Sequence, residues 1–348
     1  MNKKSLLVLA SVVAGLVLLL ALIQQADHGS SDASDRLLLD GLAEQADEIR
    51  QIQLLFPDGK DGVTVHREND RWVVSDRHNY PADIGKLGQL VSGLAEARIV
   101  EEKTSDAARY VQLGVDDPAS GGSGSKVIVG GEGFFYEVIL GEVAQRDYRY
   151  ARVAGDARSY LVDRKLEVAE DASDWLLTDI IDLPSDLVRR VIISHADGET
   201  LTLEKTTRDE TNFSVLDIPE GRELSYVSVG NGIAGALANL ALEDVRPEAA
   251  DTAAAIAVYE TWGGLRVTVS VFVEDDTAWL AFAADAVPQA EPDLQESADP
   301  TGTGSDNESD PESEAAKLNS RLAQWQYRVA EHKKNLLVRR WEDILKSR

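Results

Sequence analysis

The side chains that most often carry chemistry are the histidines, and their spacing does not favour a metal site. No two of the five are separated like the paired ligands of a metal-binding helix, and no His-Glu-x-x-His motif occurs. We therefore expect no metal and no cofactor, and we interpret the histidines as surface residues in or beside strands. They are His28, His66, His78, His195 and His332. The chain also lacks cysteine, which excludes thiolate ligands, a cysteine nucleophile and disulfides.

Two pairs of carboxylates and one glycine-rich stretch are the other candidates for chemistry. Asp116-Asp117 and Asp275-Asp276 could act as catalytic carboxylates or as calcium ligands. Each pair lies at a turn, however, where aspartate is favoured because its side chain bonds nearby main-chain amides. Gly121-Gly-Ser-Gly-Ser125 lacks the spacing of a nucleophile elbow and the lysine of a phosphate loop. These patterns predict turns and a flexible loop, with no catalytic residues.

Three aromatic residues are the candidates for a ligand or partner surface. They are Trp72, Tyr80 and Trp175. A tryptophan in a half-buried strand or helix is more often part of the core than a binding platform, so both interpretations stay open.

The composition excludes one class of partner. The 348 residues carry a formal net charge of −26. An excess of acid on this scale disfavours nucleic acid, because phosphate binding needs clustered lysine and arginine. A hydrophobic content of 43% is enough to build a core.

The N-terminus predicts the compartment. The run from Leu6 to Ile23 is apolar over 18 residues, about 27 Å of helix, which is long enough to cross a bilayer. Two lysines precede it and three aspartates follow it, so the positive-inside rule places the N-terminus in the cytoplasm and the remainder outside. A cleaved signal peptide is an alternative, but Gln24-Gln25-Ala26 lacks the usual small residues. A buried core helix is a further alternative. We predict a transmembrane anchor at residues 1–26.

The body of the chain predicts an α+β fold made of two similar units, each an antiparallel sheet with a helix. Residues 48–170 and 187–284 each contain three alternating segments, a helical run and a further series of alternating segments. The helical runs are residues 84–97 and 229–240. The Asp-Gly turns of the two units lie 139 residues apart, and Gly93-Leu94-Ala95 precedes Ala236-Leu237-Ala238 by 143. This near-constant spacing indicates an internal duplication.

Other segments flank or join the two units. Residues 27–47 are expected to form a tether and linker helix, and residues 171–186 a connecting helix that contains Trp175. Residues 285–316 hold ten acidic and no basic residues, so we expect a disordered insertion. Residues 317–348 are expected to form a closing strand and a basic C-terminal helix. That helix could contact anionic lipid or the acidic insertion, although packing on the adjacent sheet is the favoured interpretation.

A series of short motifs resembles a family of uncharacterised bacterial membrane-anchored proteins, domain-of-unknown-function family 4340. The motifs are Arg71-Trp72-Val73-Val74, Tyr80-Pro81-Ala82-Asp83, Leu113-Gly114-Val115-Asp116-Asp117-Pro118, Leu140-Gly141 and Trp175. The resemblance implies a single-pass protein of the bacterial inner membrane with its bulk in the periplasm. It also implies an accessory role in ABC-type transport of the gliding-motility kind, and it supplies no catalytic residues. The acidic insertion departs from the family pattern, and the second unit has no Tyr-Pro-Ala-Asp motif.

We therefore expect a non-enzymatic accessory or scaffold protein of an ABC-type transport or envelope system. Its expected partners are the lipid bilayer, through the anchor, and a membrane protein such as an ABC permease component. The alternative is a module that binds envelope glycan or peptide through Trp72 or Tyr80. A hydrolase based on aspartate or glutamate is a third hypothesis.

Overall fold

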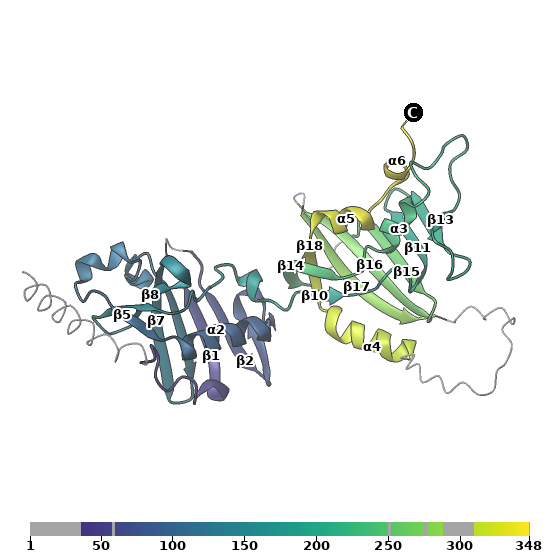
Figure 1. The fold of residues 1–348 in the computed structure, drawn as a ribbon. Coiled ribbons are helices and arrows are strands. Elements are labelled where there is room, and N and C mark those ends of the chain that lie inside the picture. Colours follow the sequence, from purple (N-terminus) through teal and green to yellow (C-terminus); the bar gives the residue numbers. More distant parts are fainter. Residues whose placement is uncertain (1–35, 58–59, 250–251, 275–276, 288–309, 348) are drawn as a thin grey trace, which may run out of the picture. The chain divides into compact units, whose positions relative to one another are not determined.

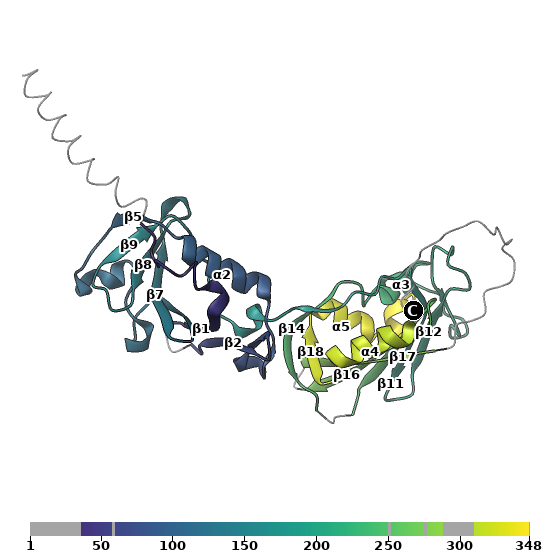
Figure 2. The same cartoon turned by 90° about the horizontal axis from the view of Figure 1, so that it is seen from below.

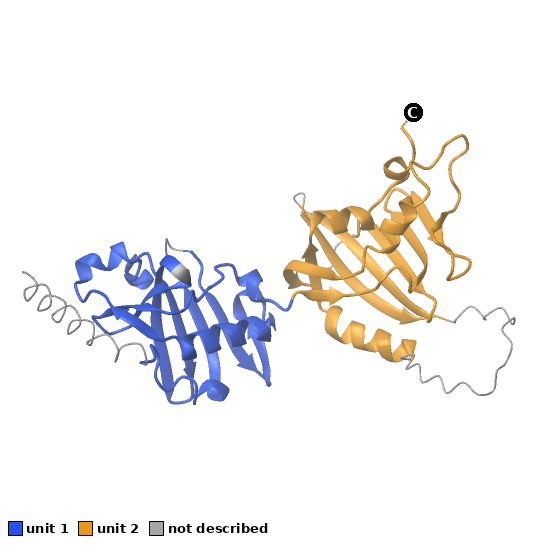
Figure 3. Ribbon diagram, viewed as in Figure 1, with its two compact units in different colours: residues 1–177 blue, residues 178–348 orange. Residues whose placement is uncertain are grey.

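The structure is a computed structural model that describes residues 36–57, 60–249, 252–274, 277–287 and 310–347. The predicted anchor, Asp275-Asp276 and most of the predicted acidic insertion lie outside the described residues. Within the described ranges, no helix is long and apolar enough to span a bilayer. The chain divides into two compact units, Met1–Leu177 and Thr178–Arg348, shown in blue and orange in Figure 3.

The first unit is an antiparallel sheet of nine strands crossed on one face by a helix (Figures 1 and 2). The strand order is β4-β3-β2-β1-β6-β7-β8-β9-β5. The bounds are β1 Ile49–Leu55, β2 Val63–Glu68, β3 Arg71–Val74, β4 Tyr80–Pro81, β5 Ile99–Glu102, β6 Ser125–Gly131, β7 Phe134–Val143, β8 Arg149–Val153 and β9 Ser159–Val162. Alternation along these strands buries one set of side chains beneath the helix, as the sequence predicts.

Helix α2, Ile84–Glu96, begins where its sequence predicts and ends one residue earlier. The side chain of Asp83 accepts a hydrogen bond from the main-chain amide of Lys86 (3.1 Å) and so caps the first turn. Leu87, Leu90 and Leu94 are buried against the sheet because they share one helical face.

The second unit has a sheet of nine strands in the order β10-β14-β18-β17-β16-β15-β11-β12-β13. The strands are β10 Asp179–Ile181, β11 Val188–His195, β12 Thr200–Glu204, β13 Ser214–Val215, β14 Leu240–Pro247, β15 Ala255–Thr261, β16 Leu265–Glu274, β17 Thr277–Ala286 and β18 Trp325–Val329. Its helices are α3 Val229–Ala234, α4 Pro311–Leu322, α5 Glu331–Leu337 and α6 Trp341–Ile344. Helix α4 packs against β17, and α5 packs against α3 (Figure 1).

The two sheets follow the same path. The order β5-β9-β8-β7-β6-β1-β2-β3 in the first unit matches β14-β18-β17-β16-β15-β11-β12-β13 in the second. Irregularities in strand pairing recur at matching places. In β1 the register shifts between Ile49 and Gln51. In β11 it shifts between Val188 and Arg190, each 139 residues after its counterpart in β1. Shared strand order and shared irregularities are what a duplicated unit produces.

Three predicted helices are wrong or too long. Over residues 171–186 the structure has a 3-10 turn at Ala172–Trp175 followed by strand β10, because Ile180 and Ile181 are buried through pairing with β14. The helix predicted over 229–240 ends at Ala234, where glycine follows. The predicted C-terminal helix is broken between α5 and α6, whereas the predicted closing strand is present as β18.

The predicted boundaries of the flanking segments also change. Leu37 forms an isolated bridge with Arg98, and turns follow it in place of the predicted linker helix. Asp285 belongs to β17, and α4 begins at Pro311, so both ends of the predicted insertion have regular structure. Main-chain pairing sets the ends at Leu37 and Asp285, whereas the local cap by Asp310 sets the start of α4.

Candidate functional site

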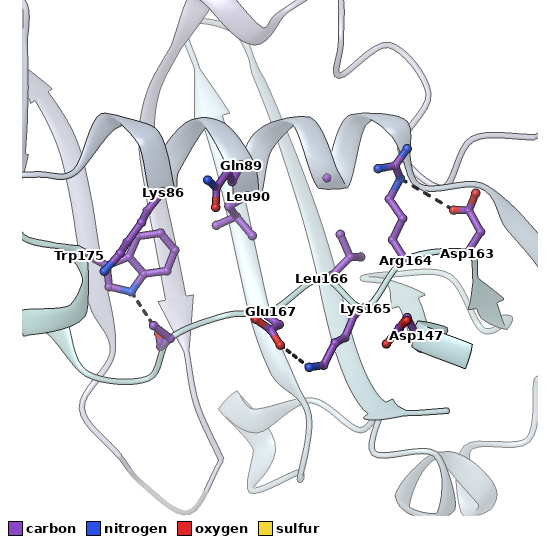
Figure 4. Close-up of a pocket in the computed structure, with 12 residues that line it drawn as sticks. Lys86, Gln89, Leu90, Asp147, Asp163, Arg164, Lys165, Leu166, Glu167 and Trp175 are labelled. Atoms are coloured by element: carbon purple, nitrogen blue, oxygen red, sulfur yellow. Dashed lines mark hydrogen bonds and ion pairs between the residues drawn. The ribbon is translucent and has the colours of Figure 1, made fainter. Parts of the chain in front are cut away.

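A groove of about 660 Å³ in the first unit is the candidate functional site. One wall is helix α2, and the other is the segment of residues 163–169 that follows β9 (Figure 4). Asp147 and Trp175 complete the lining. Cavities of this size are in the range that holds small ligands or a few side chains of a partner.

The wall from α2 is a single stripe along the helix. It consists of Lys86, Gln89, Leu90 and Gly93, at the spacing that brings side chains together on one helical face. Leu90 is also part of the core, so it forms an apolar floor. Lys86 and Gln89 are exposed above it. The ammonium group of Lys86 donates a hydrogen bond to the main-chain oxygen of Asp174 (2.5 Å).

The facing segment has no regular secondary structure, and side chains hold it in place. The main-chain amide of Arg98 donates to the carboxylate of Asp163 (2.9 Å), which fixes the start of the segment. The guanidinium of Arg149 donates to the main-chain oxygens of Gly141 (2.8 Å) and Leu166. Burial lowers the pKa of Arg149, which remains the donor that anchors this wall.

Leu166 is the residue where this wall meets the helix. Its backbone is left-handed, with φ of +48°, and its buried side chain lies against Gly93 of α2. A left-handed leucine is strained, so the surrounding contacts must hold it there. In Figure 4 the side chains of Leu90 and Leu166 point toward the space between the two walls.

Most of the charged side chains at the rim form ion pairs. Arg164 binds Glu96 (2.8 Å), and Lys165 binds Glu167. The hydrogen bond from Lys165 lowers the pKa of Glu167, and the same bond raises the pKa of Lys165. Exposed pairs of this kind contribute little to stability. They leave the rim without a strong excess of either charge, around an apolar floor.

Of the three aromatic candidates, Trp175 alone lines the groove. It is 3% exposed, and its indole nitrogen donates a hydrogen bond to the main-chain oxygen of Ala169 (3.1 Å). Tyr80 is also 3% exposed and lies in β4. Trp72 is half-buried in β3, opposite Arg67 on the neighbouring strand. The structure therefore does not bring Trp72 and Tyr80 into one site with Trp175.

The side chains of the acidic pair Asp116-Asp117 form hydrogen bonds and an ion pair within the fold. The carboxylate of Asp116 accepts hydrogen bonds from the amide (2.9 Å) and hydroxyl (2.6 Å) of Ser123. Burial acts to raise the pKa of Asp116, but the Ser123 bonds outweigh it and the pKa is lowered. Asp117 caps the following turn at Ala119 and forms an ion pair with Lys126 (2.6 Å). These contacts fit the turn chemistry that the sequence predicts.

Two of the described histidines form hydrogen bonds within their own unit. His66 bonds the Ser75 hydroxyl (2.9 Å), and His195 bonds the main-chain oxygen of Arg339 (3.1 Å). Within the described ranges, no three histidine or acidic side chains gather as a metal site would require.

The sequence does not predict the wall at residues 163–169, which it places at the end of the first unit. A signal was present on α2. Lys86 and Gly93 lie four residues before and three residues after Leu90, at helical spacing from it, and Gln89 lies at the same spacings from Lys86 and Gly93.

Comparison with protein families identifies the chain. The family model described as Domain of unknown function (DUF4340) matches residues 72–258, more than half of the 348 residues. The chain belongs to this family. The predicted resemblance is thereby confirmed at the level of the family. The DUF4340 region runs from β3 to β15, so it includes both walls of the groove and parts of both units. No curated protein and no solved structure matches the chain.

Proposed function

We propose that this DUF4340 protein is a non-enzymatic accessory or scaffold protein of an ABC-type transport or envelope system. In this proposal the run from Leu6 to Ile23 anchors it in the bacterial inner membrane, and the two units lie in the periplasm. The anchor would confine the units to the membrane surface and raise their effective concentration near membrane partners.

The observation that carries this proposal is the character of the groove. Its floor is apolar and most of its rim charges form ion pairs, as in a surface that binds a partner. An enzyme site usually holds titratable groups directed at a reacting atom. The Asp116-Asp117 pair, the clearest catalytic candidate from the sequence, caps turns on a different part of the unit.

A module that binds envelope peptide is the second candidate, and the volume of the groove favours it. A glycan is less well supported. Sugar rings stack on exposed aromatic faces, and the indole of Trp175 is almost completely covered.

The test is in-cell cross-linking of the full-length chain, followed by purification and identification of bound proteins. Stoichiometric recovery of an ABC permease component would support the accessory role. Recovery of the chain alone, or of cell-wall material, would refute it. A matched chain without residues 6–23 should lose the partner if the anchor is needed to bring the two together.

A further inference from the structure

We propose that the groove of the first unit receives a short amphipathic helix from a partner protein. This inference rests on the proposed accessory function and names the kind of partner segment that would be bound. The second unit provides the argument, because the connection that corresponds to the second wall of the groove forms a helix there.

The correspondence between the units follows from strand pairing. In the first unit β5 pairs with β9 so that Glu102 lies opposite Tyr160. In the second unit β14 pairs with β18 so that Val245 lies opposite Tyr327. Each paired residue of β14 lies 143 positions after its counterpart in β5. Each paired residue of β18 lies 167 positions after its counterpart in β9. By the same 143-residue spacing, Gln89 of α2 corresponds to Gly232 of α3.

Each unit also closes in the same way. After β9 in the first unit and β18 in the second, the chain runs past the helix and forms a short turn. It then forms an isolated β-bridge with the segment just before the helix. The bridge joins Ala82 to Leu176 in the first unit and Leu224 to Leu345 in the second. Residues 163–171 and 330–340 are therefore equivalent connections across the helix.

The two connections differ in conformation. In the second unit the connection contains α5, which packs directly on α3. The side chain of Leu336 lies 3.8 Å from the place a Cβ would occupy at Gly232. Leu337 is fully buried, and the ammonium of Lys333 donates to the main-chain oxygens of Ala236 (3.2 Å) and Ala238 (2.5 Å). Helix α5 thus packs along the side of α3 that corresponds to the groove wall on α2, although Gly232 itself stays exposed.

In the first unit the same connection has no helix. Leu166 alone reaches the α2 stripe at Gly93, and the remaining space is the groove. Gln89 and its counterpart Gly232 are both exposed, whereas Lys86 is exposed and its counterpart Val229, 143 residues later, is buried. The first unit therefore leaves a groove beside α2, where its duplicate packs two turns of helix against α3.

The lining indicates the chemistry of the incoming helix. Leu90, Leu166 and Trp175 form an apolar floor, which suits leucine-like side chains spaced three or four residues apart. Lys86 binds a main-chain oxygen, and it pairs with no carboxylate among the described residues. A carboxylate on the incoming helix would pair with this ammonium. We infer an amphipathic helix with aliphatic anchors and an acidic residue at one end.

The test uses the full-length chain in its native membrane, with the photo-cross-linker p-benzoylphenylalanine at position 89. The matched control carries the same residue at position 92, because Ser92 is an exposed residue of α2 outside the groove lining. The cross-linked peptide of the partner is identified by mass spectrometry. The inference expects a leucine-containing segment with helical spacing, captured about tenfold more efficiently from position 89.

Several outcomes would overturn the inference. These are equal capture from both positions, no capture from position 89, and capture of a glycan, an extended segment or a second copy of this chain. A second pair of variants tests the groove without the cross-linker. Gln89→Trp should lower recovery of the partner about tenfold, whereas Ser92→Trp should not, and unchanged recovery for both would also refute it.

The two proposals fail in distinguishable ways. A permease component that still co-purifies, with no helix captured at the groove, refutes this inference and leaves the accessory function intact. Absence of any membrane partner refutes both.

Discussion

Replacing Gly141 with alanine should severely destabilise the first unit. Gly141 lies in β7, and the family motif that begins at Leu113 packs closely against this position. A Cβ at this position would lie 2.1 Å from the main-chain oxygen of Leu113 and 2.7 Å from a methyl carbon of Val115. Real Cβ atoms essentially never approach other atoms so closely, so one of the two segments must move.

The size of the effect follows from the contacts that would be lost. Overpacking of this kind costs about 1–3 kcal/mol. The displacement also breaks the hydrogen bond from the Glu142 amide to the Leu113 oxygen (2.9 Å), for about 1 kcal/mol. Together these give a decrease of about 2–4 kcal/mol in the free energy of unfolding of the first unit.

Hydrogen exchange read by mass spectrometry can measure this loss in the full chain, because peptides from the two units are distinguished. The free energies of opening that hydrogen exchange reports for β6 and β7 should decrease by this amount. Those of the second unit should not change. The matched control is Gly88→Ala, on α2, where a Cβ would meet no atom within 4 Å. Alanine should stabilise this helix by about 0.5–1 kcal/mol. Unchanged protection in Gly141→Ala would show that the close approach is not a constraint on the fold.

Two further predictions concern single side chains. Tyr259 is fully buried and its hydroxyl donates to the main-chain oxygen of Ile233 (3.0 Å), so Tyr259→Phe should lower the free energy of unfolding by about 0.5–1.5 kcal/mol in urea titrations. No change would mean that the bond contributes nothing net. The lowered pKa of Asp116 predicts a pH effect. Its contribution to stability is complete above its ordinary pKa and is lost as the pH falls through the folded-state value. The stability difference between wild type and Asp116→Asn should therefore shrink on acidification, and a difference that stays constant down to pH of about 2 would contradict the assignment.

Much of the fold could be predicted because its determinants are local. Strands β1 and β2 alternate between inward and outward residues around turn signals, and with β3 they form the three segments predicted before the first helix. Helix α2 combines an aspartate cap with a clear apolar face. These features depend on residues that are close together in the sequence, so they can be recognised from the sequence pattern.

The predicted connecting helix failed for the opposite reason. Ile180 and Ile181 are apolar neighbours of Trp175, and their pattern is compatible with a helix or a short strand. Their structure depends on β14, about 60 residues later, which pairs with them. The candidate site was found only in part for the same reason. The sequence indicates Trp175. The wall at residues 163–169, however, depends on Arg149, which donates to the Leu166 oxygen from outside the wall, and on the amide of Arg98, which donates to Asp163.

The amino-acid sequence alone determined the α+β class, the repetition of strands and helix, and the apolar face of α2, because periodicity and turn chemistry act over short distances. It also contained the family motifs. The tertiary structure alone decided how each unit covers its helix. Residues 163–171 and 330–340 make equivalent connections, yet one contains α5 and the other leaves a groove. The sequence predicts a helix in the second connection. The packing of α5 on α3, and the bonds from Arg149 and Asp163 that hold the first connection, depend on long-range contacts.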